Sequence, residues 1–170
     1  PRLLDAYGLG ILSNPKDTIS TTLTYGLKAG HGHYDRLNFE MFAAGQPIMP
    51  DLGYPDAMND FVSGIYTWSK NTVSHNTVVV DATRQLGNVH GTVKLFANSP
   101  SARVLSVDAP GTYAQAKTYR RTMVMVDTGN DQSYYLDVFD VAGGKQHDYS
   151  LHGPPGEFDM QGGAWSAPAP

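Results

Sequence analysis

Histidine and acidic residues in the first half of the chain form a set that could bind a metal ion. His31 and His33 stand one residue apart among glycines, and Asp51 and His75 follow them. Side chains of an extended strand alternate with a period of two, so we expect both histidines of the pair on one face of a strand. Two histidines and one carboxylate with an open fourth position form a zinc ligand set. The spacing alone is not specific, and buried histidines bonded to backbone groups are the alternative.

Composition limits the classes of protein that need to be considered. The chain has 170 residues, enough for one domain with a sizeable core. Its formal net charge is −4 and it has no block of Lys or Arg, which argues against nucleic acid as a partner. It has no cysteine, so a metal would be held by His, Asp, Glu or backbone oxygen. No apolar run is long enough to span a bilayer. Because the chain starts at Pro1, we expect a processed chain, an excised domain or a fragment.

The pattern of apolar and β-branched residues predicts strands almost throughout. Gly, Pro, Asn and Asp separate the predicted strands, and residues 129–131 (Gly-Asn-Asp) predict a hairpin turn. No helical period continues over three turns. We therefore expect an all-β, two-sheet antiparallel β-sandwich over residues 1–153, followed by a Pro/Gly-rich tail or loop at 154–170. The predicted strands are 3–12, 18–27, 37–42, 48–49, 77–81, 89–97, 102–107, 113–126 and 133–141.

Residues 52–72 form the least regular segment and carry several aromatic side chains. Tyr54, Tyr66 and Trp68 are separated there by glycine, proline and short polar residues. Long loops with aromatic residues are often functional, and aromatic faces stack on sugar rings. We therefore regard Tyr54 and Trp68 as candidate substrate-binding residues. A loop that its aromatic side chains pin to the core is the equally weighted alternative.

Two motifs in this order resemble the heparinase II/III-like domain of polysaccharide lyases, the group of heparinases and alginate lyases. The first is His-Gly-His-Tyr-Asp at 31–35, followed by Asp51, and the second is Ser-His-Asn-Thr-Val-Val-Val-Asp at 74–81. Segments 119–122, 135–139 and 147–153 are also similar to that domain, so the resemblance covers roughly residues 20–153. Either motif alone would be weak, whereas their combination is specific.

The resemblance implies a zinc site and an incomplete active site. In that family the residues that correspond to His33, Asp51 and His75 bind zinc, and the one that corresponds to His31 lies at the active site. Family enzymes carry an α/α toroid before the sandwich that supplies further catalytic groups, and no toroid is present in these 170 residues. The implied partners are a uronate-containing polysaccharide or oligosaccharide and the toroid domain of the same enzyme. The implied location is periplasmic or secreted.

The implied reaction is β-elimination, in which a base removes the C5 proton of a uronate and the bond at C4 breaks. Removal of the C5 proton requires that the charge of the neighbouring carboxylate is neutralised in the transition state, commonly by donors from Asn, Arg or His. A His or Tyr side chain commonly transfers the proton. The ordinary pKa of a histidine side chain suits His31 to act as the base or the acid in this reaction. Family alginate lyases tend to carry an Arg-Tyr-Leu-Pro-type segment with a catalytic Tyr. Residues 61–68 depart from that segment, so the resemblance does not assign the tyrosine role to Tyr54 or Tyr66 and does not specify alginate as the substrate. Tyr66 is retained as the catalytic candidate of this segment.

Other interpretations remain open at this stage. The main alternative is a noncatalytic sandwich that binds carbohydrate through Tyr54, Tyr66 and Trp68. A cupin also uses His-x-His with Glu, but Glu40 stands seven positions after His33 and the cupin spacing fails. The remaining polar candidates are expected to be structural, supporting or exposed groups; they are Asp35, Asn38, Glu40, Asp81, His90, His147 and His152.

Overall fold

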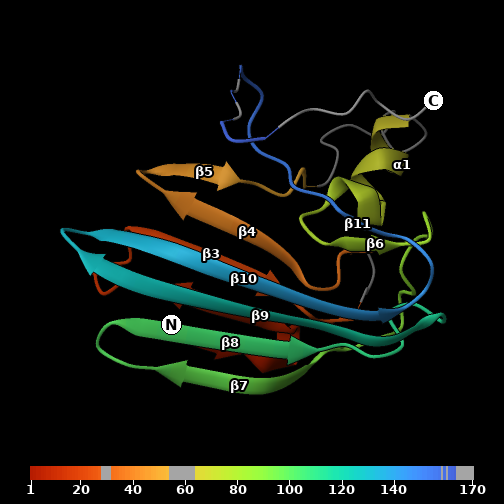
Figure 1. Cartoon of the computed structure of the whole chain (residues 1–170), viewed down its shortest axis with the longest axis horizontal. Helices are drawn as coiled ribbons and strands as arrows, with labels where there is room; N and C mark the ends of the chain where they lie inside the picture. The colour runs from red at the N-terminus through yellow and green to blue at the C-terminus, as the bar shows by residue number, and fades with distance from the viewer. Residues whose placement is uncertain (28–31, 54–63, 158, 160, 164–170) are drawn as a thin grey trace.

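The strands form two antiparallel sheets that face each other, with a small third sheet at one end (Figure 1). The protein is described from a computed structural model, which describes residues 1–27, 32–53, 64–157, 159 and 161–163. The first sheet, in the order β1-β2-β3-β4-β5, contains β1 (Arg2–Leu4), β2 (Leu9–Ser13), β3 (Ile19–Thr24), β4 (Asn38–Ala43) and β5 (Gln46–Met49). The second, in the order β10-β9-β8-β7, contains β7 (Thr92–Asn98), β8 (Ala102–Asp108), β9 (Ala116–Gly129) and β10 (Gln132–Gly143). The expected two-sheet sandwich is confirmed.

The third sheet and one short helix lie at the end of the sandwich that carries the candidate site (Figure 1). The third sheet pairs β6 (Val78–Val80) with β11 (His147–Tyr149), a strand that was not predicted. The α1 helix (Gly64–Lys70) and a 3-10 turn (Thr72–Ser74) precede β6. α1 has only seven residues, so no helix of three turns interrupts the part of the chain that is described.

The prediction of one continuous strand over residues 3–12 is wrong. Residues 3–12 contain two antiparallel strands, β1 and β2, separated by a 3-10 turn that ends at Gly8. Gly8 has φ +67, and a Cβ atom there would lie 2.1 Å from the Cα of Gly26. The backbone must approach that closely because the N–H groups of Tyr25 and Gly26 both donate to the Gly8 carbonyl. Apolar residues continue through the turn, and the reversal is therefore invisible to hydrophobic patterning.

The β9–β10 hairpin follows the prediction closely. Its turn places Asn130 and Asp131 at positive φ values of 53 and 57, as a two-residue hairpin turn requires. Along β9, side chains at alternate positions are buried. Tyr119, Met123 and Met125 of this inner face are at most 1% exposed, and they pack against residues of the first sheet in one core. The period of two therefore fixes which face of the hairpin is inside.

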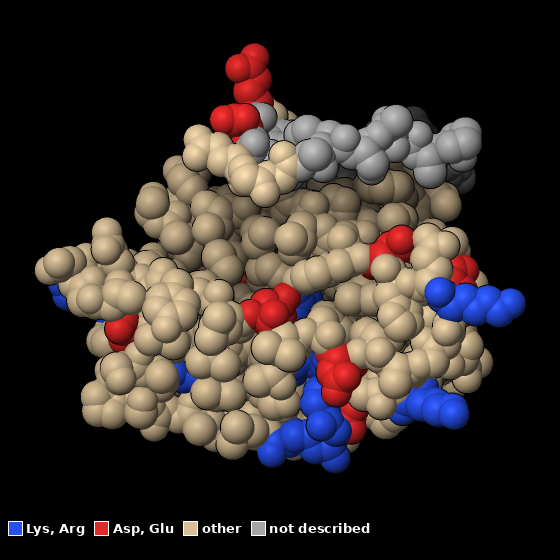
Figure 2. All heavy atoms as spheres, in the orientation of Figure 1, with Lys and Arg blue, Asp and Glu red and all other residues tan. Residues whose placement is uncertain are grey.

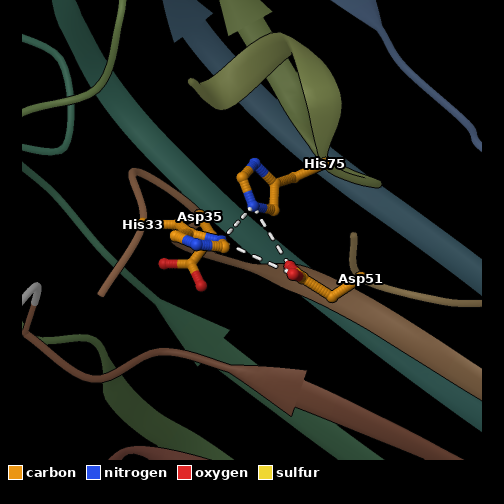
Figure 3. Close-up of side chains that lie close together, drawn as sticks. All are labelled: His33, Asp35, Asp51 and His75. Carbon is orange, nitrogen blue, oxygen red and sulfur yellow. Dashed lines mark hydrogen bonds and ion pairs between the residues drawn. The ribbon is translucent and has the colours of Figure 1, made fainter. Parts of the chain in front are cut away.

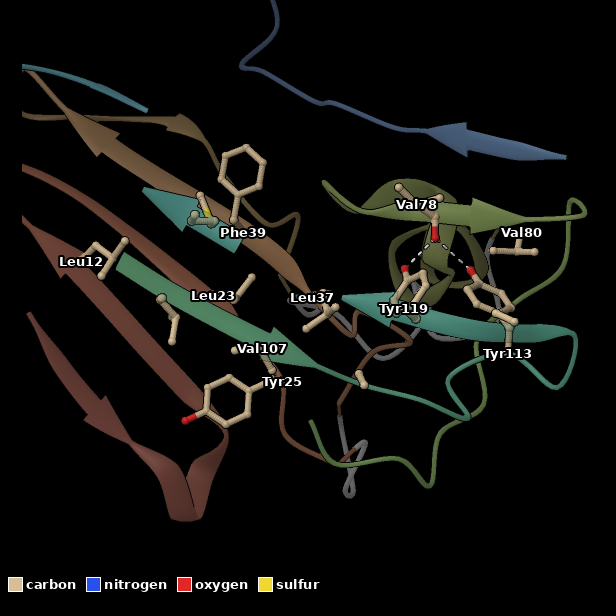
Figure 4. Close-up of a cluster of buried hydrophobic side chains, with 14 of the residues drawn as sticks. Leu12, Leu23, Tyr25, Leu37, Phe39, Val78, Val80, Val107, Tyr113 and Tyr119 are labelled. Carbon is tan, nitrogen blue, oxygen red and sulfur yellow. Dashed lines mark hydrogen bonds between the residues drawn. The ribbon is translucent and has the colours of Figure 1, made fainter. Parts of the chain in front are cut away.

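The buried core joins both sheets to β6 (Figure 4). Leu12 and Leu23 enter it from the first sheet and Val107 from the second. The hydroxyl groups of Tyr113 and Tyr119 both donate to the Val78 carbonyl, at 3.2 and 2.6 Å. Burial strongly raises the pKa of both phenols, so they act as neutral donors. The two tyrosines thus hold β6 against β9 and the connection that precedes β9, and the segment that ends at His75 is held with it.

Charged side chains are spread over the surface. On the face shown in Figure 2, Lys and Arg lie mostly in the lower part with Asp and Glu beside them, and much of the rest of the described surface is uncharged. The chain has 12 Lys and Arg against 16 Asp and Glu. Among the described residues, no helix has the length and apolar character needed to cross a membrane.

Candidate metal centre

Three side chains from distant parts of the sequence converge at one end of the sandwich (Figure 3). Nδ1 of His33 lies 3.0 Å from Nε2 of His75. The carboxylate of Asp51 lies 3.5 Å from the His33 nitrogen and 3.1 Å from the His75 nitrogen. The structure therefore brings together the three residues that the family resemblance implies as zinc ligands.

Each of the three residues comes from a connection between regular elements. His33 lies in the connection from β3 to β4, Asp51 follows β5, and His75 ends the 3-10 turn before β6. The expectation that the His-x-His pair lies on a strand is wrong for His33, since β3 ends at Thr24 and β4 begins at Asn38. His31 lies outside the described residues, so the expectation that it lies close to His33 stays a prediction.

A second acidic residue, Asp35, lies beside these three side chains. Ligand atoms of His33, Asp35, Asp51 and His75 all lie within 4.8 Å of one another, and we call these four residues the His/Asp cluster. Sequence reasoning assigned Asp35 only a supporting role. Its position two residues after His33 is the signal that could have included it among the candidate ligands.

The ring of His75 is oriented by the chain segment that precedes it. Its Nδ1 lies 2.7 Å from the carbonyl oxygen of Asn71, so Nδ1 carries the proton and donates it. Nε2 then faces the His/Asp cluster, where it can bind either a proton or a metal cation. A backbone acceptor behind a histidine is the usual arrangement around a metal ligand, because it fixes both the tautomer and the direction of the ring.

The cluster favours an additional positive charge at its centre. Burial raises the pKa of Asp51, but the hydrogen bonds with His33 and His75 outweigh burial and hold this pKa well below its usual range. Burial lowers the pKa of His75, but the hydrogen bond and the charge of Asp51 raise it above its ordinary value. Burial raises the pKa of Asp35 despite the nearby charges of His75 and Arg36. A proton or a metal cation among these groups would offset the negative charge of the carboxylates and occupy the ring nitrogens that face them.

The donor set and its spacing fit a zinc ion. In a tetrahedral site with ligand bonds of about 2.0–2.1 Å, neighbouring donor atoms lie about 3.3–3.4 Å apart. The two ring nitrogens lie 3.0 Å apart, one oxygen of Asp51 lies 3.1 Å from Nε2 of His75, and the other oxygen lies 3.5 Å from Nδ1 of His33; these separations lie around that value. Imidazole nitrogen and carboxylate oxygen are donors that zinc accepts. Binding of zinc itself stays a prediction.

Two buried arginines hold the loops that carry the cluster. Arg36 donates to Asp35 at 2.8 Å and to the carbonyl of Val89 at 2.8 Å. Arg121 donates to the carbonyls of Leu37 and Asn76, at 2.6 and 2.5 Å. Sequence reasoning missed both arginines, because a charged side chain is rarely buried unless distant segments supply acceptors.

The Asn and Thr that follow His75 are structural. Asn76 accepts a hydrogen bond from the backbone of His152 and donates to the carbonyl of Phe39, at 2.6 and 3.0 Å. Thr77 donates to the carbonyl of Arg36 at 2.9 Å. This motif therefore fixes β6 relative to β4, and the position of the preceding histidine follows from it.

The two aromatic candidates among the described residues, Tyr66 and Trp68, both lie in α1 but contact different side chains. Tyr66 lies in α1 and its hydroxyl accepts a hydrogen bond from Lys70 at 3.1 Å. Trp68 is 47% exposed and its ring meets that of His152 edge-on. Tyr54 lies outside the described residues. The roles of these residues toward a substrate stay predictions.

The fold and the cluster define a β-sandwich domain with a candidate metal centre at one end. A family model described as "Heparinase II/III-like, C-terminal" matches residues 2–158, and the chain belongs to that family. The resemblance inferred from the two motifs is thereby confirmed.

Two curated relatives are named as lyases. An alginate lyase of Stenotrophomonas maltophilia (strain K279a) is 32% identical over 141 residues, which cover 72% of this chain and 18% of that protein. An exo-oligoalginate lyase of Saccharophagus degradans (strain 2-40 / ATCC 43961 / DSM 17024) is 25% identical over 163 residues, which cover 87% of this chain and 22% of that protein. The chain thus spans about a fifth of the length of these relatives.

Solved structures support the fold. A structure of heparinase III matches with a TM-score of 0.78 at 22% identity, over 94% of this chain and 25% of that chain. The heparan sulfate lyase HepC of Pedobacter heparinus matches with a TM-score of 0.69 at 18% identity, over 84% of this chain and 22% of that chain. At these identities the likeness establishes the architecture alone.

Proposed function

We propose that the protein that carries this chain is a zinc-containing polysaccharide lyase that cleaves uronate-containing glycans by β-elimination. The convergence of His33, Asp51 and His75 in a chain of this family is the observation that supports it. Because the curated relatives are named as alginate lyases, alginate is the first substrate to test. Heparan sulfate and hyaluronan are the next ones.

The zinc ion would be held by Nδ1 of His33, Nε2 of His75 and the carboxylate of Asp51. When bound, it supplies a fixed positive charge that ties three connecting segments together. Its role in this proposal is structural, since binding to the folded state alone stabilises that state. The loop that carries His33 would then be held in one conformation next to the substrate.

The proposed reaction breaks the C4–O bond of a uronate and forms a C4–C5 double bond. A base takes the C5 proton, the electron pair of that C–H bond forms the double bond, and the leaving oxygen takes a proton from an acid. His31 and Tyr66 are the residues of this chain to which we assign proton transfer, following the family resemblance. Donors that neutralise the uronate carboxylate would come in part from another domain of the intact enzyme.

The test follows the absorbance of the unsaturated uronate product with alginate, heparan sulfate and hyaluronan as substrates. The intact protein is compared with His31→Ala and Tyr66→Phe. His147→Ala is the matched control, because His147 is exposed on β11 and is assigned no catalytic or metal-binding role. Zinc content is measured for the wild type and for His75→Ala.

We expect turnover by the wild type and by the His147 variant, with large losses in the other two. Full activity in His31→Ala would remove that residue from the mechanism. Binding of the glycans without any unsaturated product would instead support the noncatalytic carbohydrate-binding module. We also propose a periplasmic or secreted location, where polymeric glycans are accessible, and fractionation of the producing cells tests it.

A further inference from the structure

A pocket of about 190 Å³ lies beside the His/Asp cluster. Its walls come from three segments: the connection between β3 and β4, the α1 helix with the residue after it, and the loop that follows β6. Two of the lining side chains are cationic, two are aromatic, and none of the described residues in the lining is a carboxylate. The lining residues are Tyr34, Tyr66, Thr67, Lys70, Asn71 and Arg84.

Each cation of the pocket is positioned by an aromatic ring. The guanidinium of Arg84 lies 3.9 Å from the centre of the Tyr34 ring. Nζ of Lys70 lies 5.2 Å from the centre of the Tyr66 ring and donates to the Tyr66 hydroxyl at 3.1 Å. Such contacts orient a cation without neutralising it. Among the ion pairs between described residues, none involves Lys70 or Arg84.

The backbone connects this pocket directly to the His/Asp cluster. Tyr34 stands between the cluster members His33 and Asp35 in the sequence, and its N–H donates to the Lys70 carbonyl at 3.1 Å. The carbonyl of Asn71, another lining residue, accepts the hydrogen bond from the His75 ring. A ligand in the pocket would therefore lie next to the segments that hold the candidate metal.

We propose that this pocket binds the carboxylate-bearing sugar of a uronate oligosaccharide, with Arg84 and Lys70 directed at the carboxylate. A guanidinium offers a planar pair of donors that matches a carboxylate, and the ammonium adds a second charge. The rings of Tyr34 and Tyr66 line the same pocket. This inference rests on the proposed function and deepens it, because it assigns substrate recognition to residues outside the His/Asp cluster.

The test measures binding of two trisaccharides to the intact protein by calorimetry. One is an alginate trisaccharide, in which every sugar carries a carboxylate, and the other is its carboxyl-reduced, neutral counterpart. The variants are Arg84→Gln, Arg84→Lys and Lys70→Met, with Lys94→Met as the control for charge, because Lys94 is exposed on β7. Thermal unfolding of each variant verifies that it is folded, and Lys70→Met keeps the test valid if Arg84→Gln does not fold.

We expect Arg84→Gln and Lys70→Met each to weaken binding of the charged trisaccharide about tenfold, since each removes a charged hydrogen-bond donor. Arg84→Lys should lose less, and Lys94→Met should bind as the wild type does. Binding of the neutral trisaccharide should change less than about twofold in every variant. Equal losses for both trisaccharides would overturn recognition of the carboxylate.

Failure of this inference is distinguishable from failure of the proposed function. If the wild type binds the alginate trisaccharide and the pocket variants bind it equally well, the pocket assignment is overturned and the proposed function stands. If the wild type binds neither alginate nor heparan sulfate oligosaccharides, the proposed function itself fails, and this inference fails with it.

Discussion

Replacement of Arg121 by methionine is expected to destabilise the sandwich strongly. The Arg121 side chain is 0% exposed and donates to two backbone carbonyls, those of Leu37 and Asn76. Its Nε and Nη2 also bind both oxygens of the Asp137 carboxylate, at 2.8 and 2.7 Å. Methionine fills a similar volume but donates no hydrogen bond. The two carbonyls then lose their partner in the interior, and a partly buried carboxylate loses its countercharge.

The magnitude follows from these lost partners. Each buried acceptor left without a donor costs about 1–3 kcal/mol, and removal of one partner from a buried ion pair costs about 3–5 kcal/mol. These contributions overlap, so we expect the free energy of unfolding to fall by about 3–5 kcal/mol. For a domain of this size, that loss corresponds to a decrease of about 6–20 °C in Tm.

Urea unfolding of the 170-residue chain, followed by circular dichroism, measures the loss. Arg120→Met is the matched control, because the neighbouring Arg120 side chain is 42% exposed and pairs with Asp108 at 3.2 Å. An exposed pair of that kind contributes less than about 1 kcal/mol. Equal destabilisation by the two substitutions would refute the role assigned to Arg121. Arg121→Lys should fall between them, because an ammonium cannot bind both carbonyls and the carboxylate in the same geometry.

Three further predictions concern the metal, the first turn and the pH dependence. A chelator should lower the Tm of the zinc-loaded wild type but leave that of His75→Ala unchanged, and added zinc should reverse the wild-type effect only. Gly8→Ala should destabilise the chain far more in urea unfolding than Gly45→Ala, because both glycines have positive φ but only Gly8 would clash with backbone. Backbone N–H groups of the β10–β11 turn lower the pKa of Asp81. The stability that its charge contributes is present above the ordinary carboxyl pKa and is lost as the pH falls through the lowered one, so Asp81→Asn should flatten that acid-side loss.

The hairpin and the strands of the second sheet were predictable because their causes are local. The β-branched and apolar residues that predict a strand over residues 113–126 are visible in the sequence, and Gly129-Asn130-Asp131 has the residues that a tight turn requires. The α1 helix was missed because its seven residues are too short to show a period. Its last carbonyl is held by the N–H of Tyr34, a contact that only the folded chain supplies.

The candidate ligands were named from residue types and motif order, whereas their geometry depends on tertiary structure. His33 and His75 are 42 positions apart, and no local rule places two rings at that separation within 3.0 Å. The strand expected for the His-x-His pair is not formed at His33, because the chain there is a connection between β3 and β4 that ends at Leu37 with φ +58. That left-handed residue is maintained by its hydrogen bonds to Thr24 and Arg121 and by complete burial of its side chain.

The sequence by itself determined the all-β class, the alternation that selects the inner faces, and the histidine and acidic residues available to a metal. The tertiary structure decided which of those residues meet, since that depends on contacts between segments far apart in the chain. Arg121 shows the physical reason most clearly. Its charge predicts a surface position. Only the carbonyls from the segments that precede β4 and β6, together with the carboxylate from β10, make its burial favourable.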